Sequence, residues 1–256
     1  MPPDRVLKTA IKAATEAGNH ALKAFGRRHR IMTKTDSTPV TVVDRECEEI
    51  LRKILSREFP EDGFFGEEFG SSGKGAKARW ILDPIDGTKA YIRGIPLWGT
   101  LLAREVLGKL TVGVIHLPAM GRLLWAVRGK GAFLDGRRMK VSATGNLWGA
   151  YIAHGDLDLF VRHRALKRLV SVARRGAVLR SLGDCPAYMW VAGGHADAMI
   201  ESEVAPWDVA APKIIMEEAG GSLTDWNGND SHLITNVVTA NRLLHPKLLK
   251  LLKKSR

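Results

Sequence analysis

Apolar side chains recur every three or four positions at the start of the chain and again after residue 44. The first set is Val6, Leu7, Ala10, Ile11, Ala14 and Ala21, and the second is Ile50, Leu51, Ile54 and Leu55. This spacing places each set on one face of an amphipathic helix. The segment 35–44, "TDSTPVTVVD", lies between the two helices and is predicted to be extended.

The middle of the chain changes to short apolar runs separated by glycine and proline. From about Trp80 to Phe133 the runs are "RWIL", "LWGTLLARE", "LTVGVIH" and "RLLWAV". Such runs between turn residues are typical of neighbouring strands, so this part predicts a mostly antiparallel sheet. Gly, Ser and Lys crowd residues 70–77, which are predicted to form a surface loop.

Strands and helices alternate in the rest of the chain. The pattern predicts strands at 149–154, 197–201 and 236–241, and helices at about 158–175, 185–193 and 206–219, the last ended by Gly220-Gly221. The segment "HPKLLKLLKK" resembles a basic membrane-surface helix, but its short length favours a closing helix that docks its leucines on the core. We place a boundary near residue 145, between halves 1–145 and 146–256 of one compact unit.

Composition gives no sign of a membrane or secreted protein. The 256 residues are 45% hydrophobic and 26% charged, the balance of a globular domain. No apolar run approaches the roughly 18 residues of a membrane span, and the N-terminal segment does not resemble a signal peptide. Cys47 and Cys185 are far apart, which argues against a disulfide framework or a zinc site. We expect a cytoplasmic protein.

The net charge of +12 raises the question of a nucleic-acid partner. The basic residues are scattered through "FGRRHR", "DGRRMK", "VRHRALKRLVSVARR" and "KLLKLLKK", without a recognised binding motif. We interpret them as solvated helix faces and expect neither nucleic acid nor membrane as a partner. A positive field also attracts small anionic molecules.

Two carboxylates three positions apart lie at the end of an apolar run in "LDPIDGTK". Pro84 fixes its own φ and lacks an N–H, so it bends the chain there. The bend can direct Asp83, Asp86 and the carbonyl of Ile85 to one point, where three oxygens form half a coordination shell for Mg²⁺. The amides of residues 87–89 could bind an anion at a helix start. Carboxylates beside a phosphate site require a metal ion between them.

Other acids have simple explanations when each is taken alone. Asp44 and Asp208 begin helices, where the macrodipole favours a negative charge. Glu67 and Glu68 could be a solvated loop pair in "FFGEEFG". Only their combination with the motif at Asp83 points to a common site.

The order of these motifs resembles the inositol monophosphatase family of lithium-sensitive, Mg²⁺-dependent phosphatases. The motifs are Asp44, Glu67-Glu68, Asp83 to Thr88, and Trp207 to Ala211 followed by "EEAGG". The resemblance spans roughly residues 5–250, and four motifs in order are far more specific than one. It implies an α+β layered sandwich with alternating α-β-α-β-α layers, usually a homodimer, and a phosphomonoesterase with two or three Mg²⁺ ions per active site.

The resemblance also assigns metal ligands position by position. Glu67, Asp83 and the carbonyl of Ile85 would hold the first ion. Asp83, Asp86 and Asp208 would hold the second, and Glu67 would also border a third, weaker position. The chemistry implied is in-line phosphoryl transfer to water.

Further roles follow from the same resemblance. Thr88, hydrogen-bonded toward Asp44, would orient and deprotonate the attacking water together with Glu67. The amides of Gly87 and Thr88 would hold the phosphate. Glu68 would support the ligands without touching the metal.

The leaving group is expected to be recognised by the second half of the chain. The stretches "KTDSTPVTVVDRE", "DPIDGTKAYIRGIPLWGTLLA" and "LGDCPAYMWVAGGHADAMIESEVAPWDVAA" most resemble the histidinol-phosphate phosphatase branch. In that branch the positions of Asp184 and Glu201 face the leaving group, beside Asp208. Two acids suit the imidazole and ammonium of histidinol. Glu201 also has a hydroxyl-binding counterpart in inositol monophosphatases, and Asp184 could merely cap its helix.

The expected activity is therefore hydrolysis of L-histidinol phosphate in histidine biosynthesis. The alternative is an inositol-1-monophosphatase or a broad-specificity sugar or nucleotide phosphatase of the same family. His154 is expected to be a structural or surface histidine, not a catalytic one. Tyr91 and Arg93 could shape the pocket entrance or a dimer contact, and Arg180 could hold substrate or cover the sheet edge.

Overall fold

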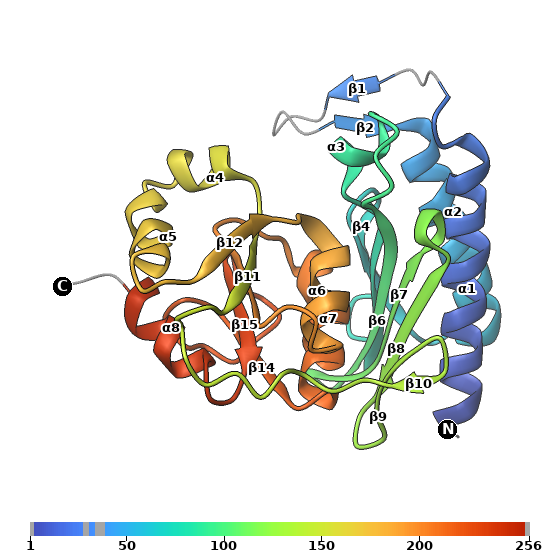
Figure 1. Cartoon of the computed structure of the whole chain (residues 1–256). Coiled ribbons are helices and arrows are strands. Elements are labelled where there is room, and N and C mark those ends of the chain that lie inside the picture. Colours follow the sequence, from blue (N-terminus) through green and yellow to red (C-terminus); the bar gives the residue numbers. More distant parts are fainter. Residues whose placement is uncertain (1–2, 28–30, 34–38, 254–256) are drawn as a thin grey trace.

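Helices and sheets alternate in five layers across the molecule (Figure 1). The computed structural model describes residues 3–27, 31–33 and 39–253. The helices are α1 (Pro3–Ala24), α2 (Val42–Glu58), α3 (Thr88–Tyr91), α4 (Leu157–Arg162), α5 (Leu166–Ala173), α6 (Asp184–Ala192), α7 (Pro206–Glu218) and α8 (His245–Leu252). Helices α1 and α2 form one outer layer, α6 and α7 the middle layer, and α5 and α8, with α4 beside them, the other outer layer. The expected α-β-α-β-α sandwich is confirmed.

The larger sheet lies between α1–α2 and the middle helices (Figure 1). Its eight strands run in the order β10-β9-β8-β7-β6-β5-β3-β4. They are β3 (Gly63–Gly66), β4 (Gly70–Ser72), β5 (Ala78–Asp86), β6 (Gly99–Val106), β7 (Lys109–Leu117), β8 (Arg122–Val127), β9 (Gly131–Leu134) and β10 (Arg137–Arg138). All neighbours are antiparallel except β3 and β5, which are parallel. The predicted antiparallel sheet is therefore present.

The smaller sheet has the order β12-β11-β13-β15-β14. Its strands are β11 (Tyr151–His154), β12 (Val178–Ser181), β13 (Ala198–Glu201), β14 (Gly221–Thr224) and β15 (Val237–Asn241). Strand β11 runs parallel to β12 and β13, and the other pairs are antiparallel. A short pair, β1 (Ile31–Thr33) and β2 (Pro39–Thr41), precedes α2. Of the segment expected to be extended, residues 35–38 lie outside the described residues, and α2 already begins at Val42.

Small side chains let α1 lie close to the larger sheet. Ala10, Ala13, Ala14, Ala17 and Ala21 are all fully buried, at the spacing of one helix face. Removing such a face from water is the main stabilising contribution to an amphipathic helix in a protein. The same reasoning holds at α8, where Leu248 and Leu252 are fully buried. No described helix is long and apolar enough to span a bilayer.

Three local expectations are wrong. The helix expected at 158–175 is two helices, α4 and α5, because Arg164 adopts a left-handed φ of 55° that an α-helix cannot accommodate. Part of the loop expected at 70–77 is strand β4, which pairs with β3. Strands β12 and β14 were not expected, since each has only four residues beside stronger helix and glycine signals.

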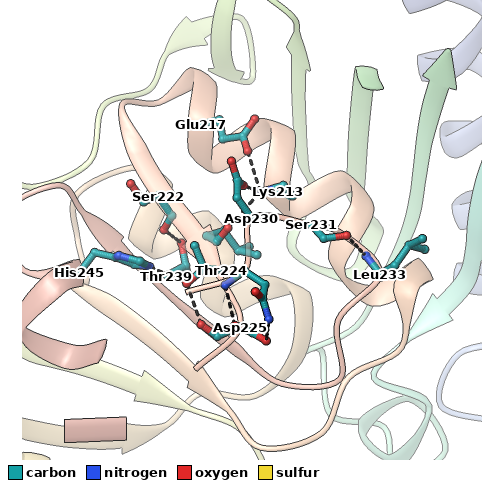
Figure 2. A network of polar contacts seen from close by, with 12 residues as sticks. Lys213, Glu217, Ser222, Thr224, Asp225, Asp230, Ser231, Leu233, Thr239 and His245 are labelled. Carbon is teal, nitrogen blue, oxygen red and sulfur yellow. Dashed lines mark hydrogen bonds and ion pairs between the residues drawn. The ribbon is translucent and has the colours of Figure 1, made fainter. Parts of the chain in front are cut away.

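Helix α7 is fixed to the smaller sheet by a buried lysine (Figure 2). Lys213 is only 6% exposed, and its Nζ donates to the carbonyl of Leu223 on β14 at 3.0 Å. The same ammonium pairs with Glu217 one turn later, at 2.8 Å, and with Asp230. Asp208 lies apart from this network, in the first turn of α7.

Candidate active site

The end of strand β5 presents two acids on the same side of the chain. In a regular strand, residues three apart point to opposite faces. The pairing of β5 with β6 is irregular between Asp83 and Asp86, which are opposite Leu101 and Gly99 respectively. This irregularity, with Pro84 inside it, allows both carboxylates to reach one point. The sequence predicted that the chain leaves the strand at Pro84, whereas β5 continues to Asp86 and the register shifts within it.

Helix α7 brings a third acid to this point. Asp208 lies in the first turn of α7, where its Oδ2 accepts a hydrogen bond from the amide of Ala205 at 2.7 Å. Carboxylate oxygens of Asp83, Asp86 and Asp208 all lie within 4.8 Å of one another. Segments more than a hundred residues apart thus meet in one acid cluster, with the oxygen ligands that Mg²⁺ prefers.

Glu67 joins this cluster through the parallel pairing of β3 with β5. Its backbone N–H donates to the carbonyl of Leu82 at 3.1 Å, which places it beside Asp83. Burial raises the pKa of Asp83 well above its usual value, and the charges of Glu67, Asp86 and Asp208 raise it further. Burial also raises the pKa of Asp208 to about 7. The ionised cluster therefore favours binding of a cation.

Gly87 turns the chain from β5 into α3. Its φ of +83° lies in the left-handed region, and a Cβ there would lie 2.7 Å from the carbonyl oxygen of Leu97. Only glycine fits without a shift of the backbone. The first amides of a helix have no partner within that helix, so those at Gly87 and Thr88 can bind an anion.

The contacts of Thr88 differ from those implied by the family resemblance. Its hydroxyl donates its single proton to the carbonyl of Ile85 at 3.0 Å, so that proton does not reach Asp44. The Oδ2 of Asp44 accepts from the backbone N–H and the hydroxyl of Thr41, at 2.8 and 2.6 Å, and caps α2. Asp44 thus caps α2, and its catalytic role stays a prediction.

A cavity of about 280 Å³ contains most of the expected site residues. Glu67, Asp86, Gly87 and Thr88 line it from the larger sheet, and Asp184, Glu201 and Asp208 line it from the C-terminal half. A larger hollow of about 640 Å³, along residues 71–79, contains none of the acid cluster. The volume of a cavity therefore does not identify the candidate site here. The acidic residues that line the smaller cavity identify it.

The two acids expected to face the leaving group lie in the wall from the C-terminal half. Asp184 begins α6, and burial raises its pKa to about 6. Glu201 ends β13, where burial raises its pKa to about 8. The hydroxyl of Tyr188 on α6 donates to Glu201 and fixes one of its oxygens.

Among the lining residues that sequence reasoning missed are Lys89, Asp156, Tyr188 and Glu203. The ammonium of Lys89 is 2.6 Å from the carboxylate of Asp156, so this ion pair joins the two walls of the cavity. Lys89 was noticed only for its amide. Asp156 lies in "YIAHGDLDLF", where the sequence gave no signal for a site residue.

Other residues singled out from the sequence lie away from the cavity lining. Tyr91 is buried, and its hydroxyl donates to the carbonyl of Ala21 at 2.8 Å, so it packs α3 on α1 and does not shape an entrance. Buried His154 contacts the carbonyl of Gly155, 2.7 Å from Nδ1, in agreement with a structural role. Arg180, on the edge strand β12, lies over the ring of Tyr151 on β11.

Comparison with known proteins identifies the family that the sequence motifs resemble, over nearly the whole chain. The model of the inositol monophosphatase family matches residues 3–256. The chain is 39% identical to a histidinol-phosphatase of Chlorobaculum parvum, over 97% of this chain and 96% of that protein. It is 34% identical to an inositol-1-monophosphatase of Mesorhizobium japonicum, over 99% and 98%. The crystal structure of the extragenic suppressor protein SuhB from Bartonella henselae superposes with a TM-score of 0.92 at 32% identity, covering 98% of this chain and 100% of that one.

The family is Mg²⁺-dependent and acts on small phosphorylated substrates, and the acid cluster is suited to bind a metal. Within the family, the resemblance to histidinol-phosphatases agrees with the expectation from the sequence. The chain belongs to the inositol monophosphatase family and is a phosphoric monoester hydrolase.

Proposed function

We propose that this chain hydrolyses L-histidinol phosphate to L-histidinol and phosphate, a reaction of histidine biosynthesis in the cytoplasm. The observation that carries the proposal is the excess of acid in the cavity. Seven carboxylates and one lysine are among the described lining residues, in a protein whose net charge is +12. Asp184 and Glu201 lie outside the proposed metal ligands and suit a cationic leaving group, whereas Asp156 and Glu203 contact Lys89 and His163.

The residues of the acid cluster fit Mg²⁺. Within the described part of the chain, the buried Oδ1 atom of Asp83 has no hydrogen-bond partner, although an unpaired carboxylate oxygen is costly in the interior. A cation at this point would satisfy it. We propose that the oxygens of Glu67, Asp83, Asp86, Asp208 and the Ile85 carbonyl hold two or three ions.

Protein groups position the reactants around this cluster. Bound Mg²⁺ polarises the phosphate oxygens and lowers the pKa of water. The amides of Gly87 and Thr88 bind the phosphate oxygens. Because the Thr88 hydroxyl donates to the Ile85 carbonyl, its Oγ1 lone pairs remain to accept a hydrogen bond from the attacking water. Glu67 accepts the proton of that water.

The wall from the C-terminal half would hold the alcohol that leaves. Tyr188 fixes one oxygen of Glu201, and we propose that the other faces the substrate. Asp184 begins α6 close to Gly87, since its Oδ2 would lie 3.1 Å from a Cβ at that position. The ammonium and imidazole of histidinol can each pair with one of these two acids.

The experiment that tests the proposal compares kcat/KM for histidinol phosphate, myo-inositol 1-phosphate, fructose 1,6-bisphosphate and adenosine 3′,5′-bisphosphate, each with Mg²⁺. We expect histidinol phosphate to have the highest value. If myo-inositol 1-phosphate is hydrolysed equally well or better, the alternative inositol monophosphatase activity replaces our assignment. No phosphate release from any of the four would end the enzyme proposal.

Variants locate the specificity within the cavity. Asp184→Asn and Glu201→Gln should raise KM for histidinol phosphate more than KM for glycerol 2-phosphate, which carries no positive charge. Asp158→Asn, an exposed acid on α4 that does not line the cavity, is the matched control and should change neither value. Equal losses on both esters would remove Asp184 and Glu201 from the specificity role.

We also propose a homodimer, as the family resemblance implies. Light scattering after size-exclusion chromatography should give twice the chain mass of 28.1 kDa.

A further inference from the structure

A buried carboxylate on α2 contacts the backbone beside Glu67. Glu48 is fully buried and is outside the cavity lining. Its Oε2 accepts the amide of Glu68 at 2.8 Å, and its Oε1 accepts the amide of Phe69 at 3.3 Å. The turn that follows Glu67 is therefore tied to α2 by two hydrogen bonds to one charged group.

Arg52, one helical turn later, holds this carboxylate and the next strand. Its Nε donates to Glu48 at 2.8 Å, and its terminal nitrogens donate to the carbonyl of Gly70 at 2.7 Å and to the hydroxyl of Ser72 at 3.2 Å. The guanidinium also lies 5.1 Å from the ring centre of Phe64. Helix α2 thus holds both strands of the β3–β4 hairpin, on each side of Glu67.

The residue before Glu67 completes the arrangement. A Cβ on Gly66 would clash with the carboxylate of Glu48, so the backbone passes directly against that group. Glu67 lies between Gly66 and Glu68, whose positions are both set by Glu48. A backbone held at both neighbours leaves the Glu67 side chain few directions in which to point.

We propose that Glu48, oriented by Arg52, is a positioning residue that directs Glu67 toward the Mg²⁺ site. The inference rests on the proposed role of Glu67 as a metal ligand. The negative charge is needed because all the groups that face Glu48 in these contacts are N–H donors. A glutamine of the same shape would turn its NH₂ group toward one of them.

The test measures Mg²⁺ binding by isothermal titration calorimetry, without substrate. Glu48→Gln should weaken Mg²⁺ affinity by about 10- to 100-fold, the usual loss when a group supporting a ligand is removed. The matched control is Glu49→Gln, an exposed acid on the same helix, which should bind Mg²⁺ like the wild type. In activity assays, excess Mg²⁺ should restore much of kcat in Glu48→Gln. An affinity equal to that of the wild type would overturn the proposal.

A double-mutant cycle separates positioning from a general loss of structure. In a Glu67→Gln background, Glu48→Gln should weaken Mg²⁺ binding little further, because Glu67 no longer contributes. An equal loss in both backgrounds would contradict positioning through Glu67. If Glu67→Gln by itself binds Mg²⁺ like the wild type, the proposed ligand role of Glu67 is wrong and the inference falls with it.

Arg52→Lys provides a second variant that keeps the charge and leaves Glu48 in place. Lysine cannot make the three separate donations of the guanidinium, so Mg²⁺ affinity should fall, though less than in Glu48→Gln. Arg57→Lys, exposed on the same helix, is its control. If Glu48→Gln does not fold, an unchanged Mg²⁺ affinity in folded Arg52→Lys still overturns the proposal.

Discussion

Asp83 combines burial, three neighbouring acids and an unpaired oxygen, so its ionised form is unfavourable until a cation binds. We expect Mg²⁺ to raise the stability of the wild type by about 2.7 kcal/mol at a concentration 100 times its Kd. Asp83→Asn removes one of the repelling charges. The variant should therefore be at least as stable as the wild type in EDTA and should gain much less from Mg²⁺.

Thermal unfolding with EDTA and with increasing Mg²⁺ measures both effects. An Asp83→Asn protein with the wild-type response to Mg²⁺ would contradict the assignment of Asp83 as a ligand.

Gly87 allows a comparison between backbone strain and close contact. Gly94 has a similar φ of +72°, but a Cβ there would meet no atom within 4 Å, whereas a Cβ on Gly87 would contact a carbonyl oxygen. Gly94→Ala should lower the free energy of unfolding by about 1–2 kcal/mol, the cost of a left-handed alanine, and leave kcat/KM unchanged. Gly87→Ala should cost more and should also lower kcat/KM, because the amides that we propose bind the phosphate shift.

Chemical denaturation and steady-state kinetics on both variants check this prediction. Equal losses of stability and activity in the two would show that strain alone matters at Gly87.

At the scale of elements, α7 joins the acid cluster at its start to a buried lysine at its centre (Figure 2). Lys213→Met keeps the length of the side chain but removes three charge-assisted contacts. We expect the free energy of unfolding to fall by about 1.5–3 kcal/mol, the usual contribution of hydrogen bonds to charged groups. Urea denaturation measures it.

The control for Lys213→Met is Lys250→Met, on the exposed face of α8. It should leave the free energy of unfolding nearly unchanged. Because Lys213 is away from the cavity lining, kcat/KM for histidinol phosphate should stay within the error of the wild type. An undiminished stability in Lys213→Met would mean that burial of the ammonium cancels its contacts.

Elements also differ in how well the sequence specifies them. The face of α1 and the strands β5 to β8 were predictable because long periodic patterns encode them locally. The break at Arg164 and the strands β12 and β14 could not be predicted, because tertiary pairing outweighs a weak local preference there.

Across the whole molecule, buried imidazoles make stability depend on pH. Burial lowers the pKa of His116, between α1 and β7, and the pKa of His245, beside β14. In the unfolded chain both titrate near 6.5. As pH falls below about 6.5 the unfolded state binds protons before the folded state does, so stability decreases. Each group contributes a slope of at most about 1.4 kcal/mol per pH unit.

His116→Gln isolates one of these contributions. The amide can still donate to the carbonyl of Ala14, which lies 3.2 Å from Nδ1 of His116, but it does not titrate. The difference in unfolding free energy between variant and wild type should therefore change in favour of the variant between pH 7 and pH 5. A difference that is constant with pH would show that His116 has the same pKa in both states.

The sequence by itself determined the chemistry of this protein. Residue types and short spacings in "DPIDGT" and "PWD" encode a strand end, a glycine turn and helix-start acids, because these depend on local backbone preferences and on the ligands that a hard cation accepts. The resemblance to the family followed from those motifs, and the α-β-α-β-α layers were implied by that resemblance. The individual roles of the ligands stay a prediction.

Only the tertiary structure decided which distant residues meet. Three contacts join segments that no local pattern relates. They are the ion pair of Lys89 with Asp156, the hydrogen bond of Tyr188 to Glu201, and the hydrogen bond from the amide of Glu68 to Glu48. Each depends on the packing of the two sheets about the middle helices and on strand register, which fix side chains to within a few ångströms. The sequence pointed to a phosphate and a metal, whereas the packing created the acidic wall that we propose receives the rest of the substrate.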